Sequence, residues 1–411
     1  VVSVGSMSRG TSFRDAFATE AVRTINRLSR LSARGSGTVI GGKVGLALSP
    51  NLLTELARGR DVALVSGTNG KTTTTAMIAA GWGENTATND TGSNMPEGHV
   101  AALVASKSTS VVLEVDEAWL GDVARATKPR VVTLLNLSRD QLDRANEVRR
   151  IAERWRALVA SERQITYVAN ANDPLVVYAA ELAERVRWCD VPTPWTTDAV
   201  SCPHCTQPLH FSDDSWWSEC GFKKPETSTT TLRGDDVIVS GVALRLDLQL
   251  PGAFNEVNAA LALTTLSCLG VDVPGALESV NALASVAGRF SVVLWRGHHL
   301  RLLLAKNPAG FTAMLTTLTK NEGDIWIAIN ARLADGHDPS WLYDVPFEAL
   351  RGSRVYCFGD RRLDLAARLD YAGVDYVVVD DETALPFSSD VINVVANYTA
   401  FQQWRERSAP C

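Results

Sequence analysis

The residues best suited to chemistry form a glycine- and threonine-rich loop between two apolar segments. These segments read as a strand and a helix, which is the context that a phosphate-binding loop needs. Gly67 and Gly70 let the backbone turn its N–H groups toward phosphate oxygens, Lys71 would lie along the β- and γ-phosphates, and the Thr72 hydroxyl would help to hold Mg²⁺. We therefore predict that the chain binds ATP or a close relative. The nucleotide-binding residues of the loop are Gly67, Thr68, Asn69, Gly70, Lys71, Thr72 and Thr73.

Carboxylates lie at the end of the next apolar run, residues 111–115. Glu114 would end a parallel strand, and the carboxyl edge of a parallel sheet is where ligands bind. We predict that Glu114 is a Mg²⁺ ligand, and Asp116 and Glu117 remain as alternatives within the same segment. A strand-end residue that only reaches solvent is the competing interpretation.

Side-chain amides and hydroxyls gather in two later segments. Residues 136–144 follow another apolar run and are expected at the same sheet edge, either to position Mg²⁺ and an acyl acceptor or to open a helix with Asp140 as its cap. Asn255 and Asn258 lie three apart near the start of a predicted helix and share one face. Because an amide pairs a donor with an acceptor, we predict that both contact adenine; a simple helix cap is the alternative.

Three of the seven cysteines, Cys202, Cys205 and Cys220, crowd into one short segment. In a cytosolic chain such clustering suggests a metal before it suggests disulfides. The C-x-x-C knuckle fits a zinc ribbon, but Trp217 stands where a third ribbon cysteine is expected. A degenerate ribbon that keeps its shape without metal is therefore the alternative. The candidates for a fourth ligand are His204, His210, Cys189 or another group.

Two further loops follow apolar strands in the last third of the chain. Lys306 comes at a strand end beside a Pro-Gly turn, from which its ammonium group could reach phosphates or an acyl phosphate. The loop of residues 335–344 is rich in aspartate. On spacing alone, a solvated turn is the favoured interpretation of that acidic loop.

The composition is that of a globular protein with more than one core. The chain has 411 residues, of which 45% are hydrophobic and 21% charged, so two or three domains are expected. A net charge of −6 argues against a nucleic-acid backbone as the main partner. The longest charge-free apolar stretch, residues 257–271, is too short to span a bilayer. We expect a cytoplasmic protein.

Strand and helix signals alternate along most of the chain, which predicts a doubly wound α/β fold. Residues 1–60 read as a helix and a Gly-rich segment that pack on a central ATP-binding domain, 61–289. A ribbon-like insert rich in Pro, Thr, Trp and Cys interrupts that domain at about 190–235. A smaller α/β domain follows at 290–411.

Taken together, these segments resemble the Mur ligase family over nearly the whole chain. The loop from Gly67 to Thr72 resembles the family's ATP loop, and Gly252, Asn255 and Asn258 resemble its G-x-x-N-x-x-N segment. Arg289 resembles the arginine that bridges to the C-terminal domain and contacts phosphate. Narrower features indicate one branch of the family. They lie at 35–38, 114–117, 139–144, 306–310, 335–344, 359–362 and 398–400, with the cysteine insert.

The resemblance to that branch implies a reaction, its cofactors and a partner. ATP would phosphorylate the α-carboxylate of D-glutamate in the lipid II stem peptide, and ammonia would then displace phosphate to leave D-isoglutamine. It implies ATP and Mg²⁺, and a partner glutaminase, GatD, that delivers the ammonia at the inner face of the plasma membrane. Glu114 and Lys306 would be catalytic. Asp338 would complete the partner's Cys–His pair, with Asp335 and Asp344 as alternatives.

The chain also departs from the wider family. Gln141 stands where amino-acid-adding members carry His, and the chain has no lysine between Lys128 and Lys223, where those members use a carbamylated lysine. Ser291 lies where many relatives carry an acidic residue. An amino-acid-adding or folylpolyglutamate-synthetase-like ligase is the competing function. The absent UDP-binding domain and the absent lysine argue against it. From another class, a non-catalytic ATP-binding scaffold is disfavoured by the intact Lys71, Thr72 and Glu114.

Overall fold

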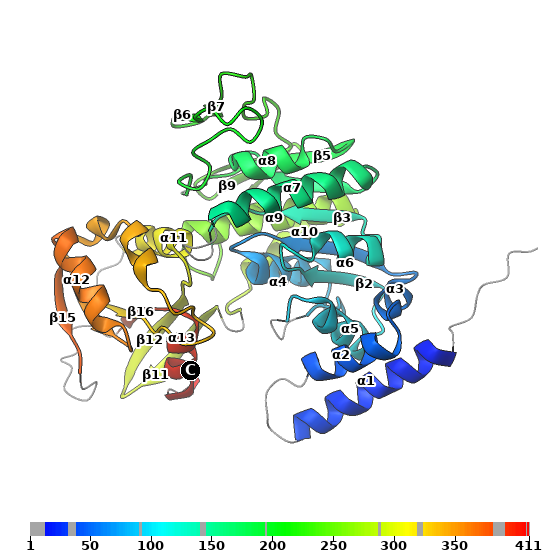
Figure 1. The fold of residues 1–411 in the computed structure, drawn as a ribbon, viewed down its shortest axis with the longest axis horizontal. Helices are drawn as coiled ribbons and strands as arrows, with labels where there is room; N and C mark the ends of the chain where they lie inside the picture. The colour runs from blue at the N-terminus through cyan, green and yellow to red at the C-terminus, as the bar shows by residue number, and fades with distance from the viewer. Residues whose placement is uncertain are drawn as a thin grey trace, which may run out of the picture.

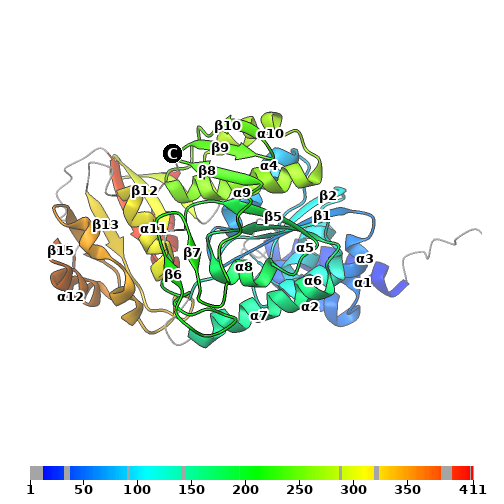
Figure 2. The same ribbon diagram turned by 90° about the horizontal axis from the view of Figure 1, so that it is seen from above.

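The fold was obtained as a computed structural model, which describes most of the chain. The described residues are 13–31, 38–89, 93–139, 145–193, 195–286, 289–318, 324–380, 391–407 and 409–410. Figures 1 and 2 show two α/β units side by side: a larger one at the N-terminal side and a smaller C-terminal unit that begins at β11. The predicted α/β fold class is confirmed. Within these residues, no helix is both long and apolar enough to cross a membrane.

The larger unit is built on an eight-stranded sheet with the order β10-β9-β8-β5-β4-β3-β1-β2. The strands from β5 to β2 run parallel, and β8, β9 and β10 pair antiparallel with one another. The strands are β1 (Asp61–Ser66), β2 (Ser110–Glu114), β3 (Val131–Leu134), β4 (Thr166–Asn170), β5 (Arg185–Asp190), β8 (Thr230–Arg233), β9 (Asp236–Val239) and β10 (Val242–Arg245). The segment predicted as an insert thus contributes β8 to the main sheet, and a separate hairpin, β6 (His210–Phe211) with β7 (Trp216–Trp217).

Helices cover both faces of this sheet, because successive strand residues point to opposite sides. Leu64 of β1 joins a core shared with one set of helices, and its neighbour Val65 joins the core on the other face. The first set comprises α3 (Leu52–Ala57), α5 (Pro96–Ala105), α6 (Leu120–Thr127), α7 (Ala145–Ser161) and α8 (Pro174–Ala180); the second comprises α4 (Lys71–Trp82), α9 (Ala253–Leu269) and α10 (Val273–Asn281).

The Gly-rich segment near the N-terminus is helical where it is described, which the sequence interpretation missed. α2 (Thr38–Leu48) packs between α1 (Phe13–Leu31) and α5. A Cβ atom on Gly42 would come within 1.9 Å of the Glu97 carbonyl oxygen, so only glycine permits this close approach. The glycines therefore mark tight helix packing rather than a loop.

The C-terminal unit has a seven-stranded sheet with the order β15-β14-β13-β16-β12-β11-β17. Its strands are β11 (Phe290–Trp295), β12 (His298–Leu304), β13 (Ile325–Ala328), β14 (Arg354–Phe358), β15 (Asp375–Val378), β16 (Val391–Ala396) and β17 (Ala409–Pro410). Its helices are α11 (Pro308–Leu318), α12 (Arg362–Ala372), α13 (Tyr398–Arg407) and the short 3₁₀ turns η2 (Ser340–Asp344) and η3 (Phe347–Leu350). In the first view of the ribbon, α11 is the helix that faces the larger unit.

Candidate functional site

The phosphate-binding loop lies between β1 and α4, as predicted from its residues. Gly70 caps α4 with a positive φ of 86°, and a Cβ atom there would lie 2.4 Å from Oδ1 of Asn258. Glycine is therefore required both by the backbone conformation and by the neighbouring side chain. The free N–H groups of the first turn of α4 make this a site suited to phosphate.

Lys71, the first residue of α4, is buried and points back along its own loop. Its Nζ donates to the carbonyl oxygens of Gly67 and Thr68 and lies 3.3 Å from Oε2 of Glu117. Glu117 comes from the segment after β2. Of the three acidic residues that the sequence grouped at this strand end, Glu117 is thus the one that reaches the loop lysine.

The predicted metal ligand Glu114 is the last residue of β2, beside Val65 of β1. Its backbone is held from three sides: the Asn89 side chain bonds both its N–H and its C=O, each at 2.8 Å, and Nε2 of His99 bonds the same C=O at 2.8 Å. The Glu114 side chain is 3% exposed and lies at the carboxyl edge of the parallel strands. A carboxylate at this edge, beside the phosphate-binding loop, fits a cation ligand.

The loop after β3 is bonded to the phosphate-binding loop along its length. The Thr68 hydroxyl donates to the carbonyl of Ser138 and accepts from its N–H, both at 3.0 Å. Asn69 and Asn136 exchange backbone-to-side-chain bonds at 2.9 and 3.0 Å. Of the predicted polar segment, these first residues are therefore part of the site. Asp140 to Arg144 lie outside the described residues.

Two contacts join the same loop to the C-terminal unit and to Arg289, the residue just before it. The side-chain amides of Asn69 and Asn307 bond reciprocally, at 3.2 and 3.3 Å. Nε of Arg289 donates to the Thr72 hydroxyl at 3.2 Å. A third link runs between the units further out, where Arg139 pairs with Asp198 and lies 3.6 Å from Oδ2 of Asp344. Thr72, predicted to help hold Mg²⁺, and Arg289, predicted to contact phosphate, thus meet at one point.

A cavity of about 160 Å³ opens between the loop, the start of α9 and α11. Asn255 and Asn258 line it, but their amides are engaged within the chain: Asn258 bonds Thr74 and Asn255, and Asn255 bonds the Pro251 carbonyl. The sequence interpretation missed several other lining residues from distant segments. They are Asn170, Asp173, Thr193, Trp195, Phe254 and Phe290.

Asp173 is the missed residue for which the sequence held a signal, since an Asp-Pro pair typically opens a helix. Its carboxylate accepts from the N–H groups of Leu175 and Val176 in the first turn of α8. It also accepts from the Leu137 N–H at 2.8 Å. Asp173 therefore caps α8 and fixes the loop after β3 at the rim of the cavity.

The three aspartates of the 335–344 loop have separate environments. Asp335 accepts from Arg332 N–H and from Thr399, at the start of α13. Asp344 pairs with Arg139, as described above. Asp338 is exposed, and hydrogen bonds from Ser340 hold the pKa of its carboxyl below the usual range. Lys306 is half-buried between β12 and α11 and is not among the described residues that line the cavity.

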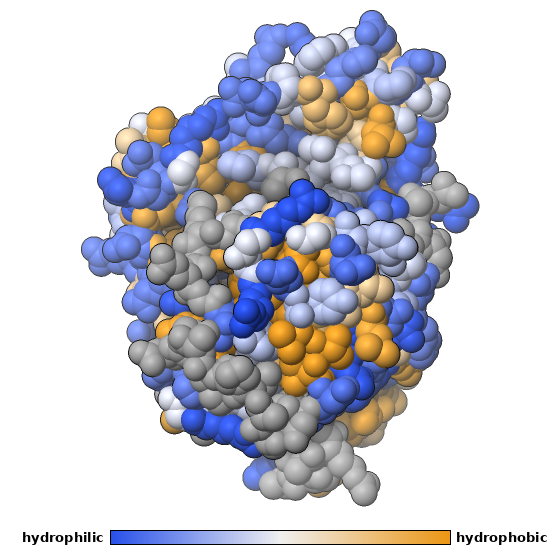
Figure 3. Space-filling model, turned by 90° about the vertical axis from the view of Figure 1, so that its left-hand side faces the viewer, coloured by the Kyte–Doolittle hydropathy of each residue, from blue (hydrophilic) through white to orange (hydrophobic). Residues whose placement is uncertain are grey.

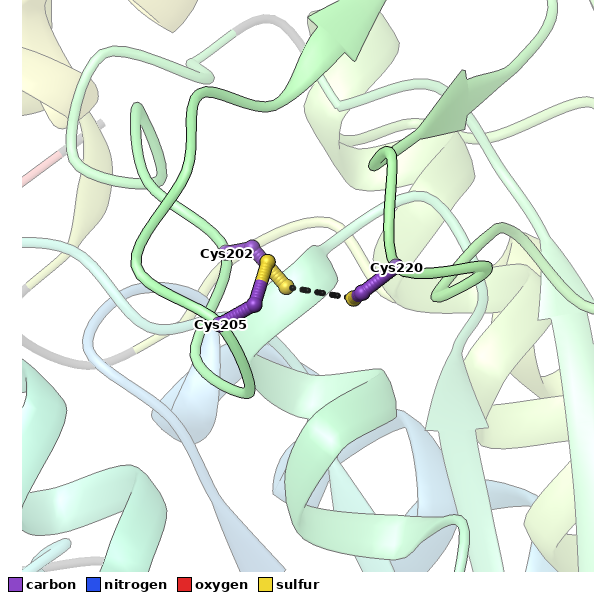
Figure 4. A group of neighbouring side chains, drawn as sticks. All are labelled: Cys202, Cys205 and Cys220. Atoms are coloured by element: carbon purple, nitrogen blue, oxygen red, sulfur yellow. Dashed lines mark hydrogen bonds between the residues drawn. The ribbon is translucent and has the colours of Figure 1, made fainter.

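The three clustered cysteines converge, as Figure 4 shows. Their sulfur atoms all lie within 4.8 Å of one another, and Cys202 and Cys220 are 3.6 Å apart. Tetrahedral zinc with Zn–S bonds of about 2.3 Å would place sulfurs about 3.8 Å apart. A hydrogen bond with Ser218 lowers the pKa of Cys205 to about 7, which favours the thiolate that a metal binds. The three sulfurs are therefore spaced as three of the four ligands of a tetrahedral zinc ion would be.

None of the three named candidates for a fourth ligand points into this cluster. His204 bonds Glu181 at 2.8 Å, His210 stacks on Trp217, and Cys189 lies in β5, where it bonds Thr264. The Ser218 hydroxyl is instead the neighbouring polar group, 3.4 Å from Cys205 and 3.8 Å from Cys220. If a metal binds the three cysteines, its fourth ligand would therefore be Ser218 or a water molecule.

Comparison with known proteins agrees with this architecture. The family described as Mur ligase middle domain matches residues 65–266, and the family described as MurT ligase C-terminal matches residues 304–401. A protein of Staphylococcus aureus (strain COL) named lipid II isoglutaminyl synthase (glutamine-hydrolyzing) subunit MurT is 26% identical, over 93% of this chain and 95% of its own.

Solved structures with the same fold are more distant in sequence. A pseudomurein peptide ligase type C from Methanothermus fervidus has a TM-score of 0.67 at 17% identity, covering 87% of this chain and 80% of that one. The MurF ligase from Thermotoga maritima in complex with ADP has a TM-score of 0.58 at 14% identity, covering 88% and 83%. At these sequence identities, the similarity supports a shared fold and nothing more specific.

The burial of His99 predicts a loss of stability in acid. Burial lowers its pKa to about 4 from the ordinary 6.5, and Nδ1 has no hydrogen-bond partner in the described chain. The unfolded chain therefore binds the proton first, and the free energy of unfolding falls as pH drops from 6.5 toward 4, by up to about 1.4 kcal/mol per pH unit. Urea unfolding at several pH values, with wild type against His99→Gln, measures this.

In His99→Gln the amide can still donate to the Glu114 carbonyl, but nothing titrates, so the slope should flatten. The exposed His337→Gln is the control and should keep the wild-type slope. Parallel curves for all three proteins would show that His99 is not buried in the neutral form.

The cysteine cluster predicts that one substitution will strengthen metal binding. Ser218→Cys adds a fourth sulfur beside Cys205 and Cys220, and Zn²⁺ affinity should rise at least about tenfold because four thiolates complete the coordination shell. Competition with a chromophoric chelator measures the affinity. Thr206→Cys, in the same loop, is the control. Equal affinities in wild type and Ser218→Cys would mean that these sulfurs do not share a metal.

Proposed function

The chain belongs to the Mur ligase family, and from that premise we propose that it is the synthetase that amidates the α-carboxylate of D-glutamate in the lipid II stem peptide. The relative from S. aureus carries the name of such a synthase subunit and is similar along almost the whole chain. The MurT ligase C-terminal match extends the similarity to the unit that contacts the phosphate-binding loop. The observation that carries the proposal is the convergence of Lys71, Thr72 and Arg289 at that loop.

The proposed chemistry begins with transfer of the γ-phosphoryl group of ATP. A carboxylate oxygen of the substrate attacks the γ-phosphorus, the bond to the bridging oxygen breaks, and ADP leaves. Lys71 and Arg289 offset the negative charge on the phosphoryl oxygens. Thr72 and Glu114 would hold Mg²⁺, which when bound neutralises charge on the phosphates. Glu117, the partner of Lys71, would give way to phosphate oxygens.

Ammonia then attacks the acyl carbon, phosphate leaves, and a proton is lost to give the amide. Lys306 stands at the end of β12, where we propose that it contacts the acyl phosphate. The adjacent Asn307 is already bonded to Asn69 of the loop. Asn255 and Asn258 would form one wall of the adenine site, since their amides are held in place by each other and by Thr74.

We further propose that ammonia comes from a partner glutaminase, GatD. A glutaminase needs an activated thiolate, yet burial raises the pKa values of Cys189 and Cys357 to about 12. Cys268 is also shifted upward by burial, and the remaining described cysteines belong to the ribbon cluster. Cys205 of that cluster has a pKa of about 7, but its hydrogen-bond partner is Ser218 rather than a histidine. Among the described cysteines, none is therefore paired with a histidine as a glutaminase nucleophile would be.

Asp338 is the best-placed aspartate to serve that partner, because it is exposed and kept ionised. The surrounding face of the C-terminal unit also exposes large side chains, among them Leu333, Tyr343, Leu363 and Tyr371. Figure 3 views the molecule from the side of the C-terminal unit and shows apolar surface among polar surface. We propose that this face receives the glutaminase and that Asp338 completes its Cys–His pair.

The same proposal covers organisation and location. A central ATP-binding domain, 61–289, would carry the nucleotide and a C-terminal domain, 290–411, would close on it. The cysteine cluster would hold a structural zinc. The enzyme would act on lipid-linked substrate at the cytoplasmic face of the membrane.

Amidation measured by mass spectrometry tests the function. With lipid II, ATP, Mg²⁺ and ammonium, the product should show the mass change of one carboxylate-to-amide conversion. Lys71→Ala should lower the rate at least about a hundredfold because a phosphate contact is lost, while the exposed Lys107→Ala should not. ATP hydrolysis without amide formation, or addition of an amino acid, would overturn the proposal in favour of an amino-acid-adding ligase.

The role of Asp338 is tested by the choice of nitrogen source. In the complex with GatD, Asp338→Asn should lower glutamine-dependent amidation about a hundredfold or more, since an orienting carboxylate is lost, and should leave ammonium-dependent amidation unchanged. Asp213→Asn, another exposed aspartate, is the control. An equal fall with both nitrogen sources would place Asp338 in the synthetase reaction instead.

A further inference from the structure

One face of helix α1 packs on the protein, and the opposite face carries exposed apolar side chains. Asp15, Ala18, Val22 and Asn26 form the buried face, which contacts α2 and α5. Asp15 accepts a hydrogen bond from the Ser49 hydroxyl at 2.6 Å, which anchors the helix to the segment after α2. α1 is therefore held in place by one side.

The opposite side of α1 carries large apolar side chains in solvent. Phe13, Phe17 and Leu28 are 88%, 59% and 61% exposed. At about 100° per residue, positions 13, 17, 24 and 28 lie on one side of the helix, opposite the buried positions, and Glu20 and Thr24 stand between Phe17 and Leu28 on that side. Ile40 of the adjoining α2 is 60% exposed as well. Exposed apolar side chains that gather on one side of a helix mark an interaction site, whereas singly scattered ones do not.

Charge identifies the kind of partner. α1 contains four arginines and two acidic residues, although the whole chain carries a net charge of −6. Arg23 and Arg27 are exposed on one side of the stripe of apolar side chains, and Arg23 also pairs with the exposed Glu20 at 3.1 Å. Aromatic and aliphatic residues bordered by arginine on a surface helix are the pattern of helices that lie in the interface of an anionic bilayer.

We propose that α1 docks the enzyme on an anionic membrane through the stripe of Phe13, Phe17 and Leu28 and the arginines beside it. Figure 1 shows α1 along the lower margin of the larger unit, with α2 and α5 between it and the sheet. A second copy of this chain is the competing occupant, but two copies of α1, each with four arginines and two acidic residues, would bring like net charge into one interface. An anionic bilayer surface instead attracts the arginines.

The purpose of this surface rests on the proposed function, because a lipid-linked substrate lies in the membrane. Docking by α1 would convert the search for the stem peptide from three dimensions to two. The surface itself is defined by α1 alone and can be tested without substrate, ATP or the glutaminase.

The test is co-sedimentation of the full chain with vesicles that contain no lipid II. Vesicles of one part phosphatidylglycerol to three parts phosphatidylcholine should bind the wild type, and pure phosphatidylcholine vesicles or high salt should weaken that binding. Phe17→Glu with Leu28→Glu should lower vesicle binding at least about tenfold, because two side chains that would insert into the bilayer become charged. Ile238→Glu, an exposed apolar residue on β9, is the matched control and should bind like the wild type.

The thermal unfolding midpoint should be the same in the double variant, since both side chains are exposed. Amidation of a water-soluble stem-peptide substrate should also persist, while amidation of lipid II in vesicles should fall. Absence of wild-type binding to anionic vesicles would overturn the docking proposal, as would equal binding by the double variant. If the wild type forms a dimer or a complex with GatD and the double variant does not, the stripe would be assigned to that protein partner instead. The vesicle-binding and unfolding results do not depend on whether the amidation proposal holds, whereas the two amidation rates do.

Discussion

The site depends on one constraint: the phosphate-binding loop is held from three directions before any nucleotide reaches it. Thr68 and Asn69 are bonded to the loop after β3, Lys71 is held by its own loop carbonyls and by Glu117, and Asn69 also bonds Asn307 of the C-terminal unit. Arrangements held in this way need little reorganisation when charge develops, which is the condition for electrostatic catalysis. The two units are thus joined at the point where the chemistry would occur.

The need to hold the loop in place also explains why polar side chains surround the strand ends behind it. Parallel strands bring the ends of β1, β2 and β3 to one edge, but a strand end has unpaired backbone groups that must be satisfied. Asn89 and His99 satisfy those of Glu114, and Asp173 satisfies that of Leu137. Each of these bonds also fixes a residue that lines or adjoins the site. Stability and preorganisation therefore come from the same contacts.

The fold class and the loop were predictable because their signals are local. A glycine loop between strand and helix, and apolar runs of strand length, need no long-range information. Asn89, His99 and Asn170 were missed because the local sequence around each contains no motif for a functional site. Only the folding of the chain brings them to it. The Gly-rich α2 was missed for a related reason: glycine lowers helix propensity, and the close approach of Gly42 to Glu97 that requires it appears only in three dimensions. The environment of the cysteines likewise became clear only when Ser218, rather than a histidine, was found beside them.

The central claim is that the chain activates a carboxylate by phosphoryl transfer at this loop. The most direct measurement uses substrate labelled with oxygen-18 in the α-carboxylate of D-glutamate, followed by mass analysis of the phosphate that is released during amidation. The account predicts that each phosphate carries one labelled oxygen, because the carboxylate oxygen becomes the bridge of the acyl phosphate and leaves with phosphorus. Unlabelled phosphate, with amide still formed, would contradict it.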